Sequence, residues 1–250
     1  MCEGVQRCLL HPHSWVRLLA AQLLGLYLTR RTEHPDLAWI QDAAALKSCV
    51  LDSFEQLSLA ETVDGELSLQ VVKNLVALTR LILSLQEENL DLKDENLDHQ
   101  DQKIDLCFAL KRAVKLSNQE LIHSPTSTVR RTLVFNYIAA VCLQSTEQQL
   151  QPVLKLILTP LQREVSNSKA NPELKTHTQE VLDLIKTKMD DELFSKTLLE
   201  IQLDISKKRQ ERTANRKQNL ILHPNVAAKR KIQQNEAKRS AKKARRLHKA

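Results

Sequence analysis

One six-residue pattern occurs twice in this chain, each time at the start of an apolar stretch. Residues 12–17 and 125–130 both read Pro-x-Ser-x-Val-Arg, and apolar stretches follow at 18–28 and 133–143. Proline ends a preceding helix or fixes a turn, and serine can cap the first free amides of a helix. The pattern therefore predicts two helices that begin alike, each with an arginine in its first turn that can reach a neighbouring acid. It places three residues in the core: Trp15, Val16 and Val129.

A helix start of this kind is typical of the second helix in HEAT-type repeats, which stack helix pairs of about 40–47 residues into a solenoid. The two copies lie 113 residues apart, so further helix pairs are expected between them. Chance similarity of two helix starts is the alternative. We predict an all-α chain with a HEAT-like helical-repeat solenoid over residues 1–170, a long helix over 171–223, and a basic, partly disordered C-terminal arm over 224–250.

The composition supports helices over sheets. The chain has three glycines and 3% aromatic residues, whereas sheets use turn glycines and favour aromatics. Apolar spacing predicts helices at 36–58, 67–85, 103–122, 127–143 and 147–165, the last interrupted near Pro152 and Pro160. The acidic stretch 86–105 is predicted to be a solvated, poorly ordered insertion, with a docking surface for a basic partner as the alternative.

Residues 173–223 contain neither proline nor glycine. A partly apolar stripe that fades toward the C-terminus predicts one long helix, packed on the body of the same chain at its start and broken at Pro224. Lys188 and Glu192 interrupt the stripe, so we expect neither a self-dimerising coiled coil nor a self-dimer.

A net positive charge occurs only at one end of the chain. Residues 206–250, the basic tail, hold sixteen Lys and Arg against two acids, whereas the other 205 residues carry a net charge of −7. A basic tail of this density is suited to a polyanion. The predicted RNA-binding residues are Lys207, Lys208, Arg209, Arg212, Arg216, Lys217, Lys229, Arg230, Lys231, Lys238, Arg239, Lys242, Lys243, Arg245 and Arg246.

The mode of binding follows from what the basic tail lacks. No Phe, Tyr or Trp follows Phe194, so we expect salt-sensitive phosphate contacts in place of base stacking. A solvated tail without a specific partner is one alternative; an anionic membrane is disfavoured because the tail has no apolar face. A nuclear-localisation cluster is predicted from Lys238, Arg239, Lys242, Lys243, Arg245 and Arg246.

Catalytic chemistry has no motif in this sequence. There is no nucleophile elbow, no phosphate-binding loop and no zincin motif. His11 and His13 could ligate a metal, but two histidines across one proline are more typical of a turn. The five cysteines are scattered, and we expect reduced, buried thiols of an intracellular protein. The sequence predicts a non-enzymatic protein with no cofactor and no metal.

Three stretches in order carry a family resemblance: 11–25 (HPHSWVRLLAAQLLG), 70–75 (QVVKNL) and the predicted long helix with its basic end. They resemble the C-terminal part of the small-subunit processome component 20 family, also called the down-regulated-in-metastasis family. Its members are very large HEAT-repeat scaffolds of the nucleolar particle that processes the precursor of the small-subunit ribosomal RNA. The chain would be about the last tenth of such a protein, and Met1 would mark a fragment, an incomplete gene model or a short form.

The resemblance implies a scaffold of the small-subunit processome, located in the nucleus and nucleolus. Its implied partners are pre-ribosomal RNA, small nucleolar ribonucleoprotein particle proteins and other processome proteins, with no membrane and no small-molecule substrate. The alternative is a helical-repeat adaptor or transport-type protein that binds a peptide in its concave face, with the tail serving only as a localisation signal.

Overall fold

The structure is a computed structural model of the 250-residue chain, and it describes residues 2–33, 43–59, 65–91, 104–118, 125–167, 170–222 and 224–247. All regular secondary structure in these ranges is helical, which confirms the all-α class. The elements are α1 (Cys2–Cys8), α2 (Ser14–Glu33), α3 (Ala43–Leu59), α4 (Gly65–Asp91), α5 (Leu106–Asn118), α6 (Pro125–Gln144), α7 (Glu147–Leu150), the 3-10 turn η3 (Gln151–Val153), α8 (Leu154–Val165), α9 (Pro172–Lys188), α10 (Asp191–Leu222) and α11 (Pro224–Leu247).

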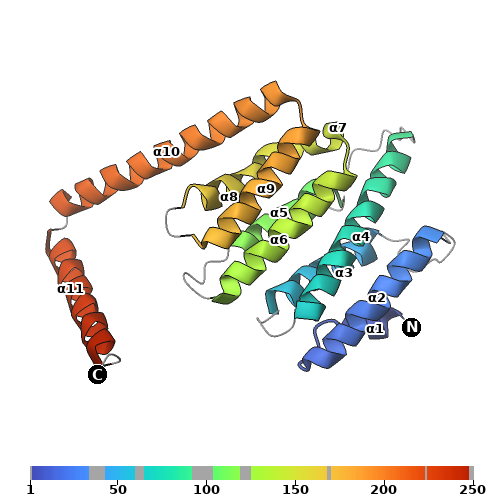
Figure 1. The fold of residues 1–250 in the computed structure, drawn as a ribbon, viewed down its shortest axis with the longest axis horizontal. Helices are drawn as coiled ribbons and strands as arrows, with labels where there is room; N and C mark the ends of the chain where they lie inside the picture. Colours follow the sequence, from blue (N-terminus) through green and yellow to red (C-terminus); the bar gives the residue numbers. More distant parts are fainter. Residues whose placement is uncertain are drawn as a thin grey trace. The chain divides into compact units, whose positions relative to one another are not determined.

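Helix pairs stack side by side in two layers (Figure 1). One layer consists of α2, α4, α6 and α9, each packed on the next, and the other contains α3, α5 and α8 in the same order. Helix α1 packs on α2 and contacts α3 through Gln6, whose Nε2 donates to Ser48 Oγ and Asp52 Oδ2, both at 2.7 Å. This arrangement is the predicted all-α helical repeat.

The core is built from apolar residues spaced three or four apart and from one buried polar pair. Tyr137 on α6 is fully buried and meets Phe54 of α3 edge to face, with ring centroids 5.6 Å apart. Its hydroxyl lies 2.8 Å from Thr79 Oγ1 on α4. Because Thr79 Oγ1 already donates to the Leu75 carbonyl at 2.8 Å, Tyr137 is the donor of the pair. Burial raises the pKa of Tyr137 above its usual range. Side chains from α3, α4 and α6 thus meet in one core.

Gly25 permits the close packing of α2 on α4. A Cβ atom at this position would lie 2.5 Å from Gln70 Nε2 and 2.8 Å from Asn74 Oδ1. Asn74 Nδ2 donates to the Ala21 carbonyl at 2.7 Å, and Gln70 Nε2 donates to Asn74 Oδ1 at 3.0 Å. A larger residue at position 25 would displace this buried amide pair.

The arginine of the repeated pattern bonds backbone carbonyls in both copies. Arg17 Nη1 donates to the carbonyls of His11 and Pro12, each at 2.9 Å, and Arg130 Nη2 donates to the carbonyl of Ser58 at 2.7 Å. The acceptors follow α1 or lie in the last turn of α3, where carbonyls lack helical partners. The arginines therefore fasten each helix start to a preceding segment, whereas the sequence suggested an acid as acceptor.

The predicted core placement of the residues before each arginine is wrong. Trp15 is 67% exposed, Val129 is 39% exposed, and Val16 is only partly buried. The buried stripe of α2 begins one turn later, at Ala20 and Ala21. The first turn does contact α3, since Gln56 Nε2 donates to the Arg17 carbonyl at 3.1 Å, but Trp15 lies on its exposed side. Trp15 instead stacks on His13, with ring centroids 6.3 Å apart.

The two prolines of segment 147–165 behave differently. Pro152 lies in η3, which separates α7 from α8 as predicted. Pro160 lies inside α8 and is buried, so the predicted interruption there is wrong. An internal proline costs a helix about 3 kcal/mol. Burial of Ile157, Leu158 and Leu161 around it stabilises the helix by more than that.

The predicted single helix over 173–223 is also wrong, because the chain forms α9 and α10 with a break between them. Met189 adopts an extended conformation (φ −112°, ψ 156°) with its side chain buried. Asp190 then caps α10, since its Oδ2 accepts the amide of Leu193 at 3.0 Å. Burying Met189 and capping the next helix together favour the break. Helix α9 packs on α6 and α8, which confirms that the start of the apolar stripe packs on the body of the same chain.

The chain divides into two compact units, 1–199 and 200–250. The predicted solenoid boundary at residue 170 falls inside the first unit, because α9 packs with the repeats before it.

Residues 86–91 of the predicted acidic insertion belong to α4, and Ile104 near its end is buried. Residues 92–103 lie outside the described residues. The first part of the helix predicted at 36–58 lies outside them too, and α3 begins at Ala43.

The cysteines are free thiols at four described positions. Cys49 and Cys142 are buried, and Cys8 and Cys107 are partly buried. Burial raises the pKa of the Cys142 thiol to about 12, although the charge of Lys188 acts in the opposite direction. Cys142 is therefore a neutral core residue at physiological pH.

Candidate nucleic-acid interface

The basic tail is helical through most of its length. Residues up to Leu222 belong to α10, and Pro224 begins α11, where a missing amide proton costs nothing in the first helical turn. His223 lies outside the described residues. The predicted helix break thus falls at the expected place, and α11 begins at the first residue of the predicted basic arm, 224–250.

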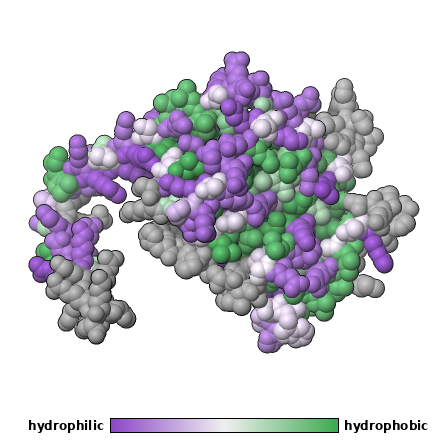
Figure 2. All heavy atoms as spheres, viewed as in Figure 1, coloured by the Kyte–Doolittle hydropathy of each residue, from purple (hydrophilic) through white to green (hydrophobic). Residues whose placement is uncertain are grey.

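The predicted RNA-binding residues of α10 are all exposed. Every residue from 206 to 222 is exposed, and hydrophilic side chains predominate along this helix in Figure 2. Arg209, Arg212 and Arg216 are spaced i, i+3 and i+7, so they share one face over about 10 Å of helix axis. Glu211 lies on a different face by the same helical spacing, roughly 130° away. A single strip of α10 therefore presents guanidinium groups without an interleaved acid.

In α11 the described basic side chains are also exposed: Lys229, Lys231, Lys238 and Arg239. The backbone of the remaining five predicted residues is helical, and their side chains lie outside the described part: Arg230, Lys242, Lys243, Arg245 and Arg246. Among the described residues from 206 onward, no carboxylate forms an ion pair with a tail cation. The tail thus offers a long row of cations whose mutual repulsion a polyanion would relieve.

In the described part of the tail, from residue 206 to residue 240, no apolar side chain is buried. Exposed apolar residues occur singly or at the end of α10, where Leu220, Ile221 and Leu222 are 59%, 80% and 59% exposed. This arrangement suits contacts to a phosphate backbone, which require charge and reach but no pocket.

The histidine pair that could hold a metal forms a turn. The amide of His13 donates to His11 Nδ1 at 3.2 Å, and the two ring centroids lie 5.4 Å apart. Among the described residues, no group of three or more His, Cys, Asp or Glu side chains is placed to hold a metal ion.

Helix α4 is long and apolar enough over residues 65–86 to cross a membrane. Half of that window is buried by neighbouring helices of the repeat.

Comparison with known proteins places these features in a family. The model of the family described as "Small subunit processome component 20 homolog, C-terminal" matches residues 5–248. The chain belongs to this family. The match spans both the helical repeat and most of the basic tail, so the two parts occur together in a single family region.

A curated relative agrees with this assignment. The Schizosaccharomyces pombe protein "U3 small nucleolar RNA-associated protein 20" is 24% identical over 241 residues, which cover 91% of this chain. They cover 9% of the relative, so the chain spans only a small part of that protein's length.

The sequence interpretation missed a second group of cations. The net charge was summed over residues 1–205, and this sum hides the local charge of α5. That helix contains Lys111, Arg112 and Lys115 and no acid. The spacing i, i+1, i+4 was a visible signal of a basic helical face. Only the stacking of α3 and α8 beside α5 shows which further cations adjoin it.

Proposed function

We propose that this chain acts in small ribosomal subunit biogenesis as a non-enzymatic scaffold of the small-subunit processome, with its basic tail in contact with pre-ribosomal RNA. The observation that carries the proposal is the family match over residues 5–248, which includes the tail. The printed name of the S. pombe relative, which ties that protein to a small nucleolar RNA, supports an RNA-containing setting.

The division of charge supports separate tasks for the two units. The helical repeat has a close-packed core and surfaces of stacked helices, which suit protein contacts. The tail has exposed cations that form no ion pair with described acids. Such cations can contact the phosphates of a nucleic acid. Processome proteins, small nucleolar ribonucleoprotein particle proteins and pre-ribosomal RNA are the proposed partners, and the nucleolus is the proposed location.

The test uses the full chain with six substitutions to glutamine in α10. The tail variant replaces Lys207, Lys208, Arg209, Arg212, Arg216 and Lys217. A control variant removes six positive charges from the first unit by replacing Arg30, Lys73, Arg80, Lys175, Lys186 and Lys196. Binding to a labelled RNA hairpin is measured over a series of salt concentrations.

Because the tail variant would neutralise about six fewer phosphates, its slope of log affinity against log salt should be lower by about 4–5, whereas the slope of the control should change little. Equal slopes for wild type and tail variant would refute the RNA-contacting role. If the tail variant kept its RNA affinity, and replacing the cluster within 238–246 blocked nuclear entry alone, the adaptor interpretation with a localisation tail would replace it.

A further inference from the structure

A compact group of cations also lies on the helical repeat itself. Lys111, Arg112 and Lys115 are exposed on α5, whose buried residues occupy the opposite side of the helix. The acid that precedes the helix, Asp105, has its Oδ1 occupied as acceptor of the Phe108 amide at 2.6 Å. The outward face of α5 therefore carries three cations and no acid of the helix itself.

Phe108 joins a cation from the neighbouring helix to this face. Its ring lies under Lys47 Nζ of α3, 5.5 Å from the centroid, and under Arg112 Cζ, 5.8 Å from the centroid. Cations at such distances are attracted to the ring face. The ring therefore holds two positive side chains near one another at the junction of α3 and α5, where they would otherwise repel.

Helix α8 packs on the other side of α5 and contributes another cation. Arg163 is exposed, whereas Leu154, Ile157, Leu158 and Leu161 of the same helix are buried. We name the following residues of the three adjacent helices the α5 face: Lys47, Lys111, Arg112, Lys115 and Arg163. In the part of the chain that the structure describes, none of them forms an ion pair.

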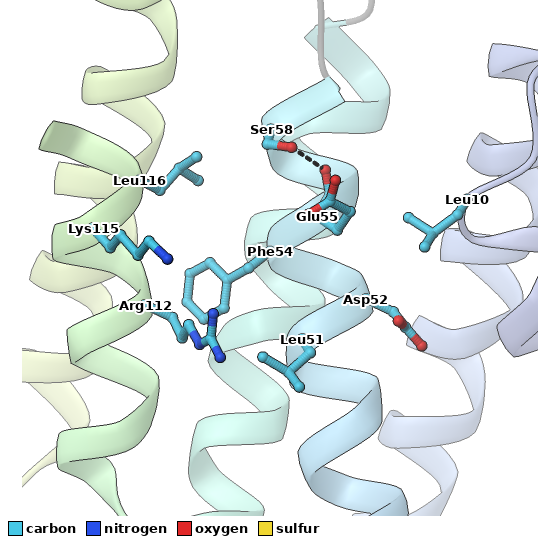
Figure 3. A pocket seen from close by; sticks show the side chains of 9 residues that line it. All are labelled: Leu10, Leu51, Asp52, Phe54, Glu55, Ser58, Arg112, Lys115 and Leu116. Carbon is cyan, nitrogen blue, oxygen red and sulfur yellow. Dashed lines mark hydrogen bonds between the residues drawn. The ribbon is translucent and has the colours of Figure 1, made fainter. Parts of the chain in front are cut away.

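Two acids of α3, Asp52 and Glu55, border this group of cations. Arg112 and Lys115 line a cavity of about 330 Å³ together with Asp52, Glu55 and Phe54. Figure 3 shows the two cations reaching from α5 toward Phe54, while Asp52 and Glu55 lie on the side of α3 nearer Leu10. Asp52 Oδ2 accepts from Gln6 Nε2 at 2.7 Å and is engaged with α1. Asp52 and Glu55 thus border the α5 face but form no ion pair with Arg112 or Lys115.

We propose that the α5 face is a second RNA-binding surface, which contacts phosphates of the same ribonucleoprotein that the basic tail contacts. The proposal rests on the function proposed above. These five cations lie on three adjacent helices of a body whose net charge is −7. Clustered cations repel one another. The negative charges of a phosphate backbone offset that repulsion, and binding also releases counterions from the RNA.

The chemistry of the α5 face favours phosphates over bases. Phe108 is only partly exposed and its ring is flanked by Lys47 and Arg112, so it is not free to stack on a base. The lysines and arginines project from two-layered, packed helices, which hold them at fixed separations. Such a surface positions RNA without reading its sequence.

The test compares three full-length proteins: wild type, the face variant and a control. The face variant carries Lys111→Gln, Arg112→Gln and Lys115→Gln. The control carries Arg30→Gln, Lys73→Gln and Lys175→Gln on the other layer of the repeat, which removes the same charge. The probes are a labelled RNA hairpin and, as a competitor, poly-glutamate. Circular dichroism melting confirms that all three fold.

Because the face variant would neutralise about three fewer phosphates than wild type, its salt slope should be lower by about 2–3, and its affinity should fall about 10–100-fold near physiological salt. Cross-linking should attach RNA to residues 106–118 of wild type. Wild-type affinity and slope in the face variant would refute the α5 face while leaving the tail's role intact. Competition by poly-glutamate that disappears in the face variant while RNA binding is kept would also refute it, in favour of an acidic protein partner. A wild-type chain that does not bind the hairpin at all would refute both proposals.

Discussion

The buried hydroxyl pair Tyr137–Thr79 makes a quantitative prediction about how the repeat is held together. Tyr137 is fully buried and donates to Thr79 Oγ1 at 2.8 Å, and Thr79 in turn donates to the Leu75 carbonyl at 2.8 Å. The bond joins α4 to α6, which are neighbours in one layer. The two single substitutions should therefore have unequal costs.

Tyr137→Phe removes the donor and keeps the ring that packs on Phe54, and Thr79 keeps its bond to Leu75. It should lower the free energy of unfolding by about 1 kcal/mol, the usual net value of one hydrogen bond. Thr79→Val leaves the Tyr137 hydroxyl buried without a partner and should cost about 2–3 kcal/mol. The double variant should cost less than the sum of the two by about 1 kcal/mol or more, because it removes the unpaired hydroxyl.

Urea unfolding of the full chain, followed by circular dichroism at 222 nm, measures all three variants. Thr159→Val is the matched control, since Thr159 Oγ1 also donates to a carbonyl four residues back, at 2.6 Å, but is exposed. It should change stability by less than about 0.5 kcal/mol. Costs that add within about 0.3 kcal/mol in the double variant would show that the pair does not contribute as a bond.

Four further predictions follow from single features. Glu164→Gln should lower the free energy of unfolding by about 2–4 kcal/mol in urea titration, because it leaves Arg131, 3.1 Å away and largely buried, without its counter-charge; a cost under about 0.5 kcal/mol would contradict this. Trp15→Ala should change stability by less than about 0.5 kcal/mol, since the ring is 67% exposed, and a large loss would restore the predicted core role. Below pH 9.0 the Cys142 thiol is protonated in both states, whereas above pH 9.0 the folded state keeps the proton and the unfolded state loses it. This thiol should therefore lower stability by about 1.4 kcal/mol per pH unit, and Cys142→Ala should reduce the slope by that amount, which is best measured below pH 10.0, where Tyr137 does not yet contribute. Replacing the last four basic residues of the cluster within 238–246 with alanine should reduce nuclear accumulation of a reporter fused to residues 206–250. Unchanged accumulation would mean that the cluster at 229–231 suffices or that import is passive.

The helices were predictable where the pattern was long and periodic. The spacing of apolar residues in 67–85 and 127–143 located α4 and α6, because a helix in a layered repeat must bury a stripe of its surface. The errors fall at positions where local chemistry and packing disagree. Pro160 is a helix breaker by local chemistry, yet packing around it retains α8. Segment 173–223 has no breaker, yet burial of Met189 and capping by Asp190 divide it.

The candidate site was predicted in part. The exposed cations of α10 followed directly from composition, because a helix with no apolar stripe has no reason to be buried. The acidic first turn and the cap at Asp190 were also visible as a helix start and were not used. The basic side of α5 was visible in the sequence, but its neighbours Lys47 and Arg163 were not, since they come from two other helices and lie far apart in residue number.

The sequence by itself determined the helical class, the confinement of high positive charge to the C-terminal end and the family, because these depend on composition and on short-range periodicity. Only the tertiary structure decided which residues of each helix are buried, where the arginines of the repeated pattern bond, and that Lys47, Lys111 and Arg163 lie on adjacent helices. The physical reason is that burial and charge clustering depend on contacts between segments far apart in the chain, and layered packing brings these segments together.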